Sequence, residues 1–139
     1  MMPFRREGRA LLVVMSLLAI ACGKTAQAPL KELQRAHSGS LDVVLLSSTD
    51  ALREGKNSAM LEFRSADGAL VDVGSVRLAA TMPMAGMAPM MANTEVRPAD
   101  VKGRYAVDGS FGMTGLWRMT IEWDGPAGMG KVSMPGTVR

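Results

Sequence analysis

The stretch Leu116-Trp-Arg-Met-Thr-Ile-Glu-Trp-Asp124 alternates between apolar and polar side chains from its second residue onward. Successive side chains of a β-strand point to opposite faces, so this pattern predicts a strand with one buried face. That face would carry the apolar members of the stretch, which are Trp117, Met119, Ile121 and Trp123. The opposite face carries an arginine, a threonine and a glutamate, and we expect it to meet water. The segment is the clearest indication that the chain folds into β-sheet.

Other segments show a similar pattern and are separated by residues typical of turns. The predicted strands lie at Leu41–Leu46, Ser58–Arg64, Leu70–Ala80 with an interruption at Gly74, Arg104–Asp108, and Lys131–Val138 with a break at Pro135. Turns or loops are expected at Asp67-Gly68, Asp108-Gly109 and Gly125–Gly130. No window beyond residue 40 shows the period of an amphipathic helix. The spacing predicts an all-β chain, an immunoglobulin-like β-sandwich of about seven strands.

The composition restricts the chemistry of this domain. The chain has 139 residues, of which 47% are hydrophobic and 21% charged, as is typical of one globular domain. It contains 13 methionines but one histidine and one cysteine, which excludes an intramolecular disulfide and argues against zinc and iron–sulfur sites. With one histidine placed before the domain, a Ser/His/Asp set is not expected either. We therefore expect no enzyme and, without a basic stripe, no nucleic-acid partner.

The N-terminus has the features of a secretory signal peptide. A basic stretch with three arginines precedes an apolar run over 10–21, which is shorter than the roughly 20 residues of a membrane-spanning helix. The run ends at Ala19-Ile20-Ala21-Cys22, which resembles a bacterial lipobox. That resemblance implies that Cys22 becomes the first residue of the mature protein and carries a lipid. The alternative is a plain signal peptide followed by an incidental cysteine.

These features divide the chain into three parts. We expect a lipoprotein signal peptide over 1–21, a lipid-anchored flexible tether over 22–40 and the β-sandwich domain over 41–139. The tether is predicted from its small and polar residues, and His37 is expected to be solvated within it. The lipid on Cys22 would bind the protein to a membrane of the cell envelope. In a Gram-negative cell it would face the periplasm from the outer membrane, because Gly23 rather than a retention aspartate follows the cysteine.

A methionine-rich segment, Thr81-Met-Pro-Met-Ala-Gly-Met-Ala-Pro-Met-Met91, follows one of the predicted strands. Its five methionines are Met82, Met84, Met87, Met90 and Met91. Pro83 and Pro89 argue against a helix or a central strand, and Gly86 permits a reversal of the backbone. We therefore expect an irregular backbone whose bends bring several sulfur atoms toward one point.

Thioether sulfur is a soft, uncharged ligand, which favours Cu(I) or Ag(I) over zinc, calcium and magnesium. The predicted ligands are Met84, Met87, Met90 and Met91, with Met82 or Met113 completing the shell. Two other interpretations remain open. The methionines, Met82 above all, pack under the loop as flexible gap-fillers, or they form an adaptable surface for a protein partner.

Four motifs follow one another in the domain: Asp67-Gly68, Met82-Pro-Met84-x-Gly86-Met87, Gly103-Arg-Tyr105 and Phe111-x-Met113-x-Gly115-x-Trp117. Their order resembles the YtkA-like domain, a family related to the FixH proteins. The resemblance implies an extracytoplasmic immunoglobulin-like sandwich, often in lipoproteins or beside heavy-metal export and oxidase-assembly components. Many members carry a histidine shortly after the methionine motif, where this chain has Ala88-Pro89-Met90-Met91. This departure favours an all-thioether site and hence Cu(I).

The function predicted from these features is a lipid-anchored extracytoplasmic domain that holds or transfers Cu(I), in copper tolerance or cuproenzyme assembly. Its expected partners are the membrane, through the lipid on Cys22, and a metal-export or oxidase-assembly protein. The alternative is a protein–protein interaction module of an envelope export or assembly complex, which would use the same loop without metal.

Overall fold

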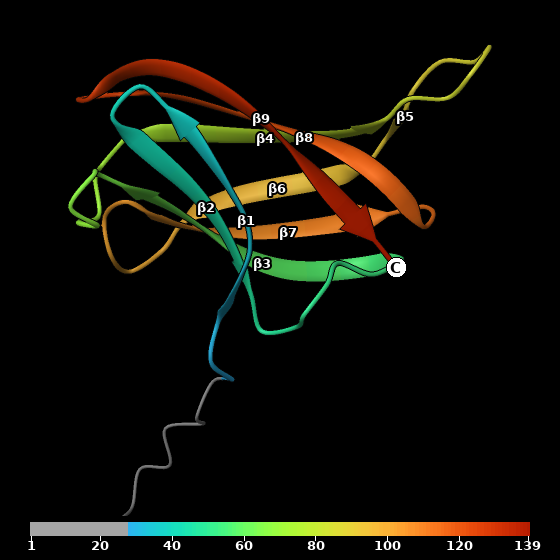
Figure 1. The fold of residues 1–139 in the computed structure, drawn as a ribbon, viewed down its shortest axis with the longest axis horizontal. Coiled ribbons are helices and arrows are strands. Elements are labelled where there is room, and N and C mark those ends of the chain that lie inside the picture. Colours follow the sequence, from blue (N-terminus) through green and yellow to red (C-terminus); the bar gives the residue numbers. More distant parts are fainter. Residues whose placement is uncertain (1–27) are drawn as a thin grey trace, which may run out of the picture.

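The computed structural model describes residues 28–139 of the chain. The predicted signal peptide, the lipidation site at Cys22 and the start of the predicted tether lie outside these residues. Nine strands follow one another within the described part (Figure 1). They are β1 (Lys31–Ser38), β2 (Leu41–Ser47), β3 (Gly55–Arg64), β4 (Ser75–Met82), β5 (Met90–Met91), β6 (Asn93–Pro98), β7 (Arg104–Phe111), β8 (Gly115–Gly125) and β9 (Gly128–Val138). Over the same residues, no helix has the length and apolar character needed to cross a membrane.

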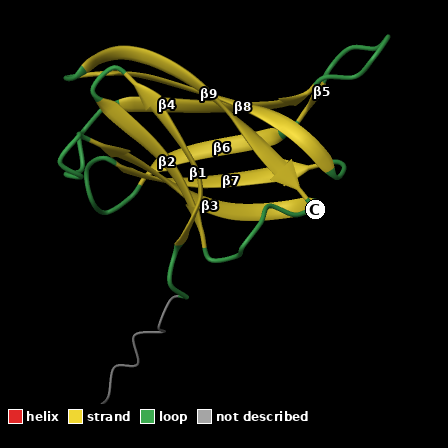
Figure 2. Ribbon diagram, in the orientation of Figure 1, coloured by secondary structure: helices red, strands yellow, loops and turns green. Residues whose placement is uncertain are grey.

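The strands form two antiparallel sheets that pack face to face (Figure 2). One sheet has the strand order β1-β2-β3-β7-β6, and the other has the order β5-β4-β8-β9. Buried side chains from both sheets form one hydrophobic core between them. The structure confirms the predicted all-β sandwich, with nine described strands instead of about seven. Strands β1, β5 and β6 have no counterpart among the predicted ones.

Strand β8 supplies the apolar centre of the core, as its alternation predicts. The four apolar residues of its inner face are all buried. The ring of Trp123 packs edge-to-face against Phe63 of β3 with centroids 5.3 Å apart, and Trp117 packs in the same way against Phe111 of β7 at 5.2 Å. Edge-to-face contacts suit the quadrupoles of aromatic rings. Since Phe63 and Phe111 belong to the five-stranded sheet, the two tryptophans join the sheets to one another.

Strand β7 continues through Asp108-Gly109, where the sequence predicts a turn. Both residues pair with β3 on one side and with β6 on the other. A central strand satisfies its backbone groups on both sides, and this outweighs the local turn preference of an Asp-Gly pair. The prediction of a turn there is therefore wrong. Pro135 likewise stays within β9, because β9 is an edge strand whose outer side requires no donor.

Residues 31–38, which the sequence assigns to the tether, form strand β1. This strand pairs with β2 and joins it through a tight turn at Gly39, whose φ is 61°. A register shift between Glu32 and Gln34 disturbs the alternation of β1, so its apolar residues do not show the strand period in the sequence. The prediction of a flexible tether is wrong for these residues, and the domain begins before residue 41.

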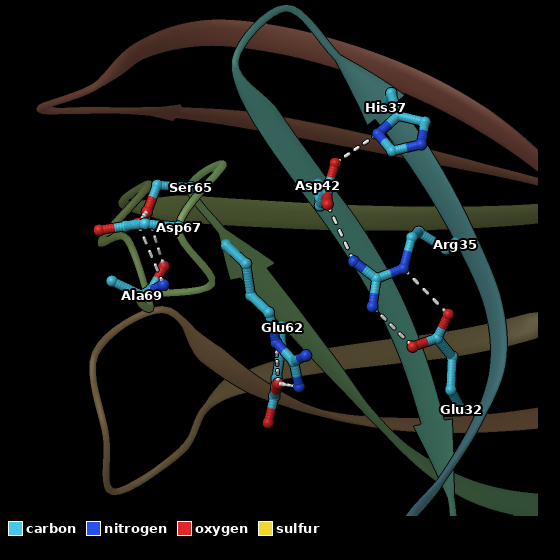
Figure 3. A network of polar contacts seen from close by, with 9 residues as sticks. Glu32, Arg35, His37, Asp42, Glu62, Ser65, Asp67 and Ala69 are labelled. Carbon is cyan, nitrogen blue, oxygen red and sulfur yellow. Dashed lines mark hydrogen bonds and ion pairs between the residues drawn. The ribbon is translucent and has the colours of Figure 1, made fainter.

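A polar network covers the outer side of β1 and β2 (Figure 3). Arg35 donates to Glu32 through Nε and Nη2 at 3.0 and 2.7 Å, and through Nη1 to Asp42 at 2.8 Å. The hydrogen bonds from Arg35 hold the pKa of Glu32 below its usual value. His37 contacts Asp42 on the neighbouring strand. The single histidine thus stands on a paired strand rather than in a linker, although its ring remains largely exposed.

A buried hydroxyl ties β7 to the bend before β4. The Tyr105 hydroxyl donates to the carbonyl oxygen of Gly74 at 2.8 Å, and burial raises the pKa of this phenol. Gly74 has φ of 78°, and a Cβ there would lie 2.5 Å from the carbonyl oxygen of Asp124. The bend therefore requires glycine, and the tyrosine satisfies an acceptor that the bend leaves inside the protein.

Tyr105→Phe is expected to lower the free energy of unfolding by about 1–2 kcal/mol, because the Gly74 carbonyl loses its partner in a buried place. Urea denaturation of the protein measures this loss. Thr120→Val provides the matched control, since the hydroxyl pair of Thr120 and Ser133, 3.1 Å apart, lies where water replaces a lost partner. A Tyr105→Phe change no larger than the Thr120→Val change contradicts the assignment.

Candidate metal site

The methionine-rich segment is a β-hairpin rather than a wholly irregular loop. Thr81 pairs with Met91 and Met82 pairs with Met90, so that β4 and β5 form its two arms. The hairpin projects beyond the end of the sandwich near the label β5 (Figure 1). Pro83 follows Met82 and Pro89 precedes Met90, so both prolines stand just beyond the last pair, where the ladder requires no donor from them. The expectation of irregular backbone therefore holds only for residues 83–89.

The pairing of β4 and β5 sorts the methionines onto two faces. Met82 and Met90 are direct cross-strand partners, and both pack against the hydrophobic core. Met91 follows Met90 on the same strand and therefore points to the opposite face, where it is 71% exposed. The sulfur atoms of Met90 and Met91, both predicted ligands, thus lie on different sides of the hairpin. Met82, predicted to complete the shell, stands at its base with Met90.

Two further predicted ligands lie in the hairpin loop. The amide of Met87 donates to the carbonyl oxygen of Met84 at 3.4 Å, which closes a turn. Gly86 has φ of 71° at the third position of this turn, as a type II turn requires. Met84 is half-buried and Met87 is exposed at the tip. The two methionines therefore stand at the first and fourth positions of one turn, and Met84 is the more buried of the two.

A second turn, between β7 and β8, lies against the base of the hairpin and carries Met113. A Cβ built on Gly112 would lie 3.4 Å from Sδ of Met90, and one built on Gly115 would lie 2.5 Å from Cε and 3.9 Å from Sδ of Met82. The thioethers of Met82 and Met90 therefore pack directly on the two glycines that flank Met113. The absence of side chains at these two positions leaves room for both sulfur atoms.

The position of this turn is held from within the core. Trp117 donates from Nε1 to the carbonyl oxygen of Met113 at 3.1 Å, and the indole is only 1% exposed. The Met113 side chain is itself 37% exposed. A rigid, buried residue thus positions the backbone of Met113, while its thioether remains accessible to an incoming ion.

The donor set at this end of the sandwich is soft and neutral. Among residues 28–139, no group of three or more histidine, cysteine, aspartate or glutamate side chains is placed to hold a metal ion. His37 contacts Asp42 on the five-stranded sheet and has no place in the hairpin. The base of the hairpin packs Met82 and Met90 against Gly112 and Gly115, on either side of Met113 in the adjacent turn, and Met84 is the next half-buried thioether along the chain. These residues suit a monovalent soft cation and not a hard one.

The sequence identifies the methionines as candidate ligands, but it does not predict how they are placed relative to one another. It does not identify Gly112 and Gly115 as the surface on which Met82 and Met90 pack. A signal was nevertheless present. The order Met-Pro at 82–83 is mirrored by Pro-Met at 89–90, which is the symmetry expected of two hairpin arms whose prolines stand just beyond the last pair.

The family model described as YtkA-like matches residues 35–122. The chain belongs to the YtkA-like family. The matched residues of this YtkA-like protein include the hairpin of β4 and β5 and the turn that carries Met113. Strand β9 lies beyond them, although it pairs with β8 over its whole length.

Comparison with solved structures and curated proteins adds little to the family assignment. A solved structure described as the Lin-41 filamin domain is 16% identical and gives a TM-score of 0.43, over 64% of this chain and 81% of that chain. None of the curated proteins matches this YtkA-like chain.

Proposed function

We propose that this YtkA-like protein binds Cu(I), or Ag(I) in its place, through the thioethers of Met82, Met90 and Met113, and that it holds or transfers the ion. The observation that supports this proposal is the packing of Met82 and Met90 on the glycines that flank Met113. The three methionines come from the paired arms of the hairpin and from the turn between β7 and β8, which meet at one end of the sandwich. They form part of a shell that no local sequence run supplies alone.

The chemistry of these ligands suits storage or transfer rather than catalysis. A thioether carries no proton that competes with the metal, so binding does not weaken as the pH falls toward neutral or below. Met82 and Met90 are half-buried and positioned by strand pairing, whereas Met113 is accessible to an exchange partner. Met84 and Met87 lie farther along the hairpin, where they offer a first contact to an arriving ion.

The place of action that we propose is the cell envelope. A lipid on Cys22 would anchor the protein to a membrane, in a Gram-negative cell to the periplasmic side of the outer membrane. There it would serve copper tolerance or cuproenzyme assembly, with a metal-export or oxidase-assembly protein as partner. Described strand structure begins at Lys31, so a short segment would join such an anchor to the sandwich.

Replacing Met82, Met90 and Met113 together by leucine is expected to weaken Cu(I) binding by at least about 100-fold. Replacing a residue that only orients a metal ligand typically lowers the metal affinity 10–100-fold. Removing the ligands themselves is expected to lower the affinity further. Leucine keeps nearly the volume of methionine, so the packing is preserved. Competition with a colorimetric Cu(I) chelator, without oxygen and under reducing conditions, measures the affinity.

Two control variants separate the site from a general effect of methionine. Met129→Leu removes an 82% exposed thioether beside the far end of β8, and Met91→Leu removes one on the opposite face of the hairpin. Both are expected to retain the affinity of the unchanged protein. The proposal is wrong if the triple variant binds Cu(I) as tightly as the unchanged protein, or if Met91→Leu alone abolishes binding.

A further inference from the structure

The outer face of the sheet β5-β4-β8-β9 has two unlike halves. In the half away from the methionine hairpin, Glu122 of β8 stands between Arg77 of β4 and Lys131 of β9. Its carboxylate contacts Arg77 Nη2 at 3.3 Å and Lys131 Nζ at 3.0 Å, and the hydrogen bond from Lys131 lowers the pKa of Glu122. Glu122, Arg77 and Lys131 therefore have charged partners within the sheet.

The half beside the hairpin is mainly apolar and contains a groove of about 300 Å3. The groove crosses β8 from the hairpin base to β9, and its lining includes Pro83, Leu116, Arg118, Ser133 and Pro135. Leu116 is 62% exposed, and both prolines are exposed as well. Exposed apolar side chains gathered in a groove are typical of a binding surface, because a bound partner removes their apolar area from water.

Arg118 is the charged residue of this groove. Its neighbours in the register are Thr81 on β4 and Pro135 on β9, in the positions that Arg77 and Lys131 occupy around Glu122. Within residues 28–139, Arg118 makes no ion pair and no side-chain hydrogen bond. A guanidinium presents a fork of donors that matches a carboxylate, and partial desolvation in a groove strengthens such a pair. A carboxylate on a binding partner would therefore form an ion pair with Arg118.

We propose that this groove docks a segment of a partner protein in which a carboxylate stands beside an apolar side chain. The carboxylate pairs with Arg118, and the apolar side chain packs on Leu116 and the prolines of the groove. Pro83 belongs both to the groove and to the methionine hairpin, so the docked segment lies beside the thioethers. The groove lies on the outer face and Met82 packs on the inner one, so the docked segment does not contact Met82. This proposal does not depend on copper.

Two short capped peptides test the proposal without a known partner. One has two leucines around a single glutamate, and the other has glutamine in place of the glutamate. Each is titrated into isotope-labelled, metal-free protein, and amide shifts in the nuclear magnetic resonance spectrum report the binding. We expect shifts at Leu116, Arg118 and Ser133, with the glutamate peptide binding roughly fivefold more tightly, as expected of a surface ion pair near the upper end of its range.

Variants distinguish the groove from a general attraction to charge. Arg118→Gln is expected to abolish the preference for glutamate, and Leu116→Ser to weaken both peptides alike. Arg77→Gln, on the same face but within the Glu122 pair, is expected to keep the preference. The proposal is overturned if neither peptide shifts the groove residues at millimolar concentration, if the shifts lie elsewhere, or if Arg118→Gln retains the preference.

Discussion

Trp117→Ala is expected to lower the free energy of unfolding by about 3–5 kcal/mol, a large part of the 5–15 kcal/mol typical of a domain. The substitution removes a fully buried indole and leaves a cavity between the two sheets. It also removes the edge-to-face contact with Phe111 and the hydrogen bond to the carbonyl oxygen of Met113.

Denaturant unfolding followed by circular dichroism measures this loss, and two variants calibrate it. Leu116→Ala removes an exposed apolar side chain from the adjacent position of the same strand, so its effect is expected to stay small. Trp117→Phe keeps an aromatic ring but loses the donor to Met113, and an intermediate loss is expected. If Trp117→Ala were no more destabilising than Leu116→Ala, the described core would be wrong.

Glu62→Ala is expected to cost about 3 kcal/mol of the free energy of unfolding, because it leaves two cations without their counter-charge. Glu62 is 2% exposed on β3 (Figure 3). Its Oε1 accepts from Arg104 Nη2 at 2.6 Å, and its Oε2 accepts from Arg64 Nε at 2.7 Å. Both arginines are partly exposed, and we therefore expect a value at the lower end of the range for broken buried pairs.

Glu122 also stands beside two cations, here on the two neighbouring strands, which makes Glu122→Ala a matched control. It contacts Arg77 and Lys131, but its side chain is 39% exposed. Because water solvates both cations there, the shift of the unfolding midpoint is expected to be that of an ordinary surface substitution. Equal midpoint shifts for Glu62→Ala and Glu122→Ala would show that burial of the carboxylate is not the deciding factor.

The strands that local patterns predict are those with one regular apolar face. Strand β8 is predicted almost to its ends because its inner face is continuous from Trp117 to Trp123. Strand β1 is missed because a register shift interrupts its alternation, and its pairing depends on β2 instead. The turn expected at Asp108-Gly109 fails for a related reason, since pairing with two neighbouring strands overrides the preference of two residues.

The candidate site, too, is predicted only in part by local sequence patterns. The sequence shows that thioether is the unusual chemistry of this chain and that most of it lies between residues 82 and 91. The grouping of Met90 with Met91 could not be tested from sequence, because the face of each side chain depends on how β5 pairs with β4. Whether Met113 belongs to the site depends on contacts between the β7–β8 turn, at Gly112 and Gly115, and the methionine hairpin.

The sequence by itself determined the all-β class, the inner face of β8, the concentration of methionine and the motifs that the YtkA-like family match bears out. Each of these rests on residues close in the chain, where periodicity and side-chain chemistry act directly. Only the tertiary structure decided which methionines share a face, which glycines receive them, and why Arg118 lacks a partner within the sheet while Glu122 has two. Those relations arise from strand register and from contacts between distant segments. A shift of one residue reverses every side chain of a strand, and local composition does not encode that register.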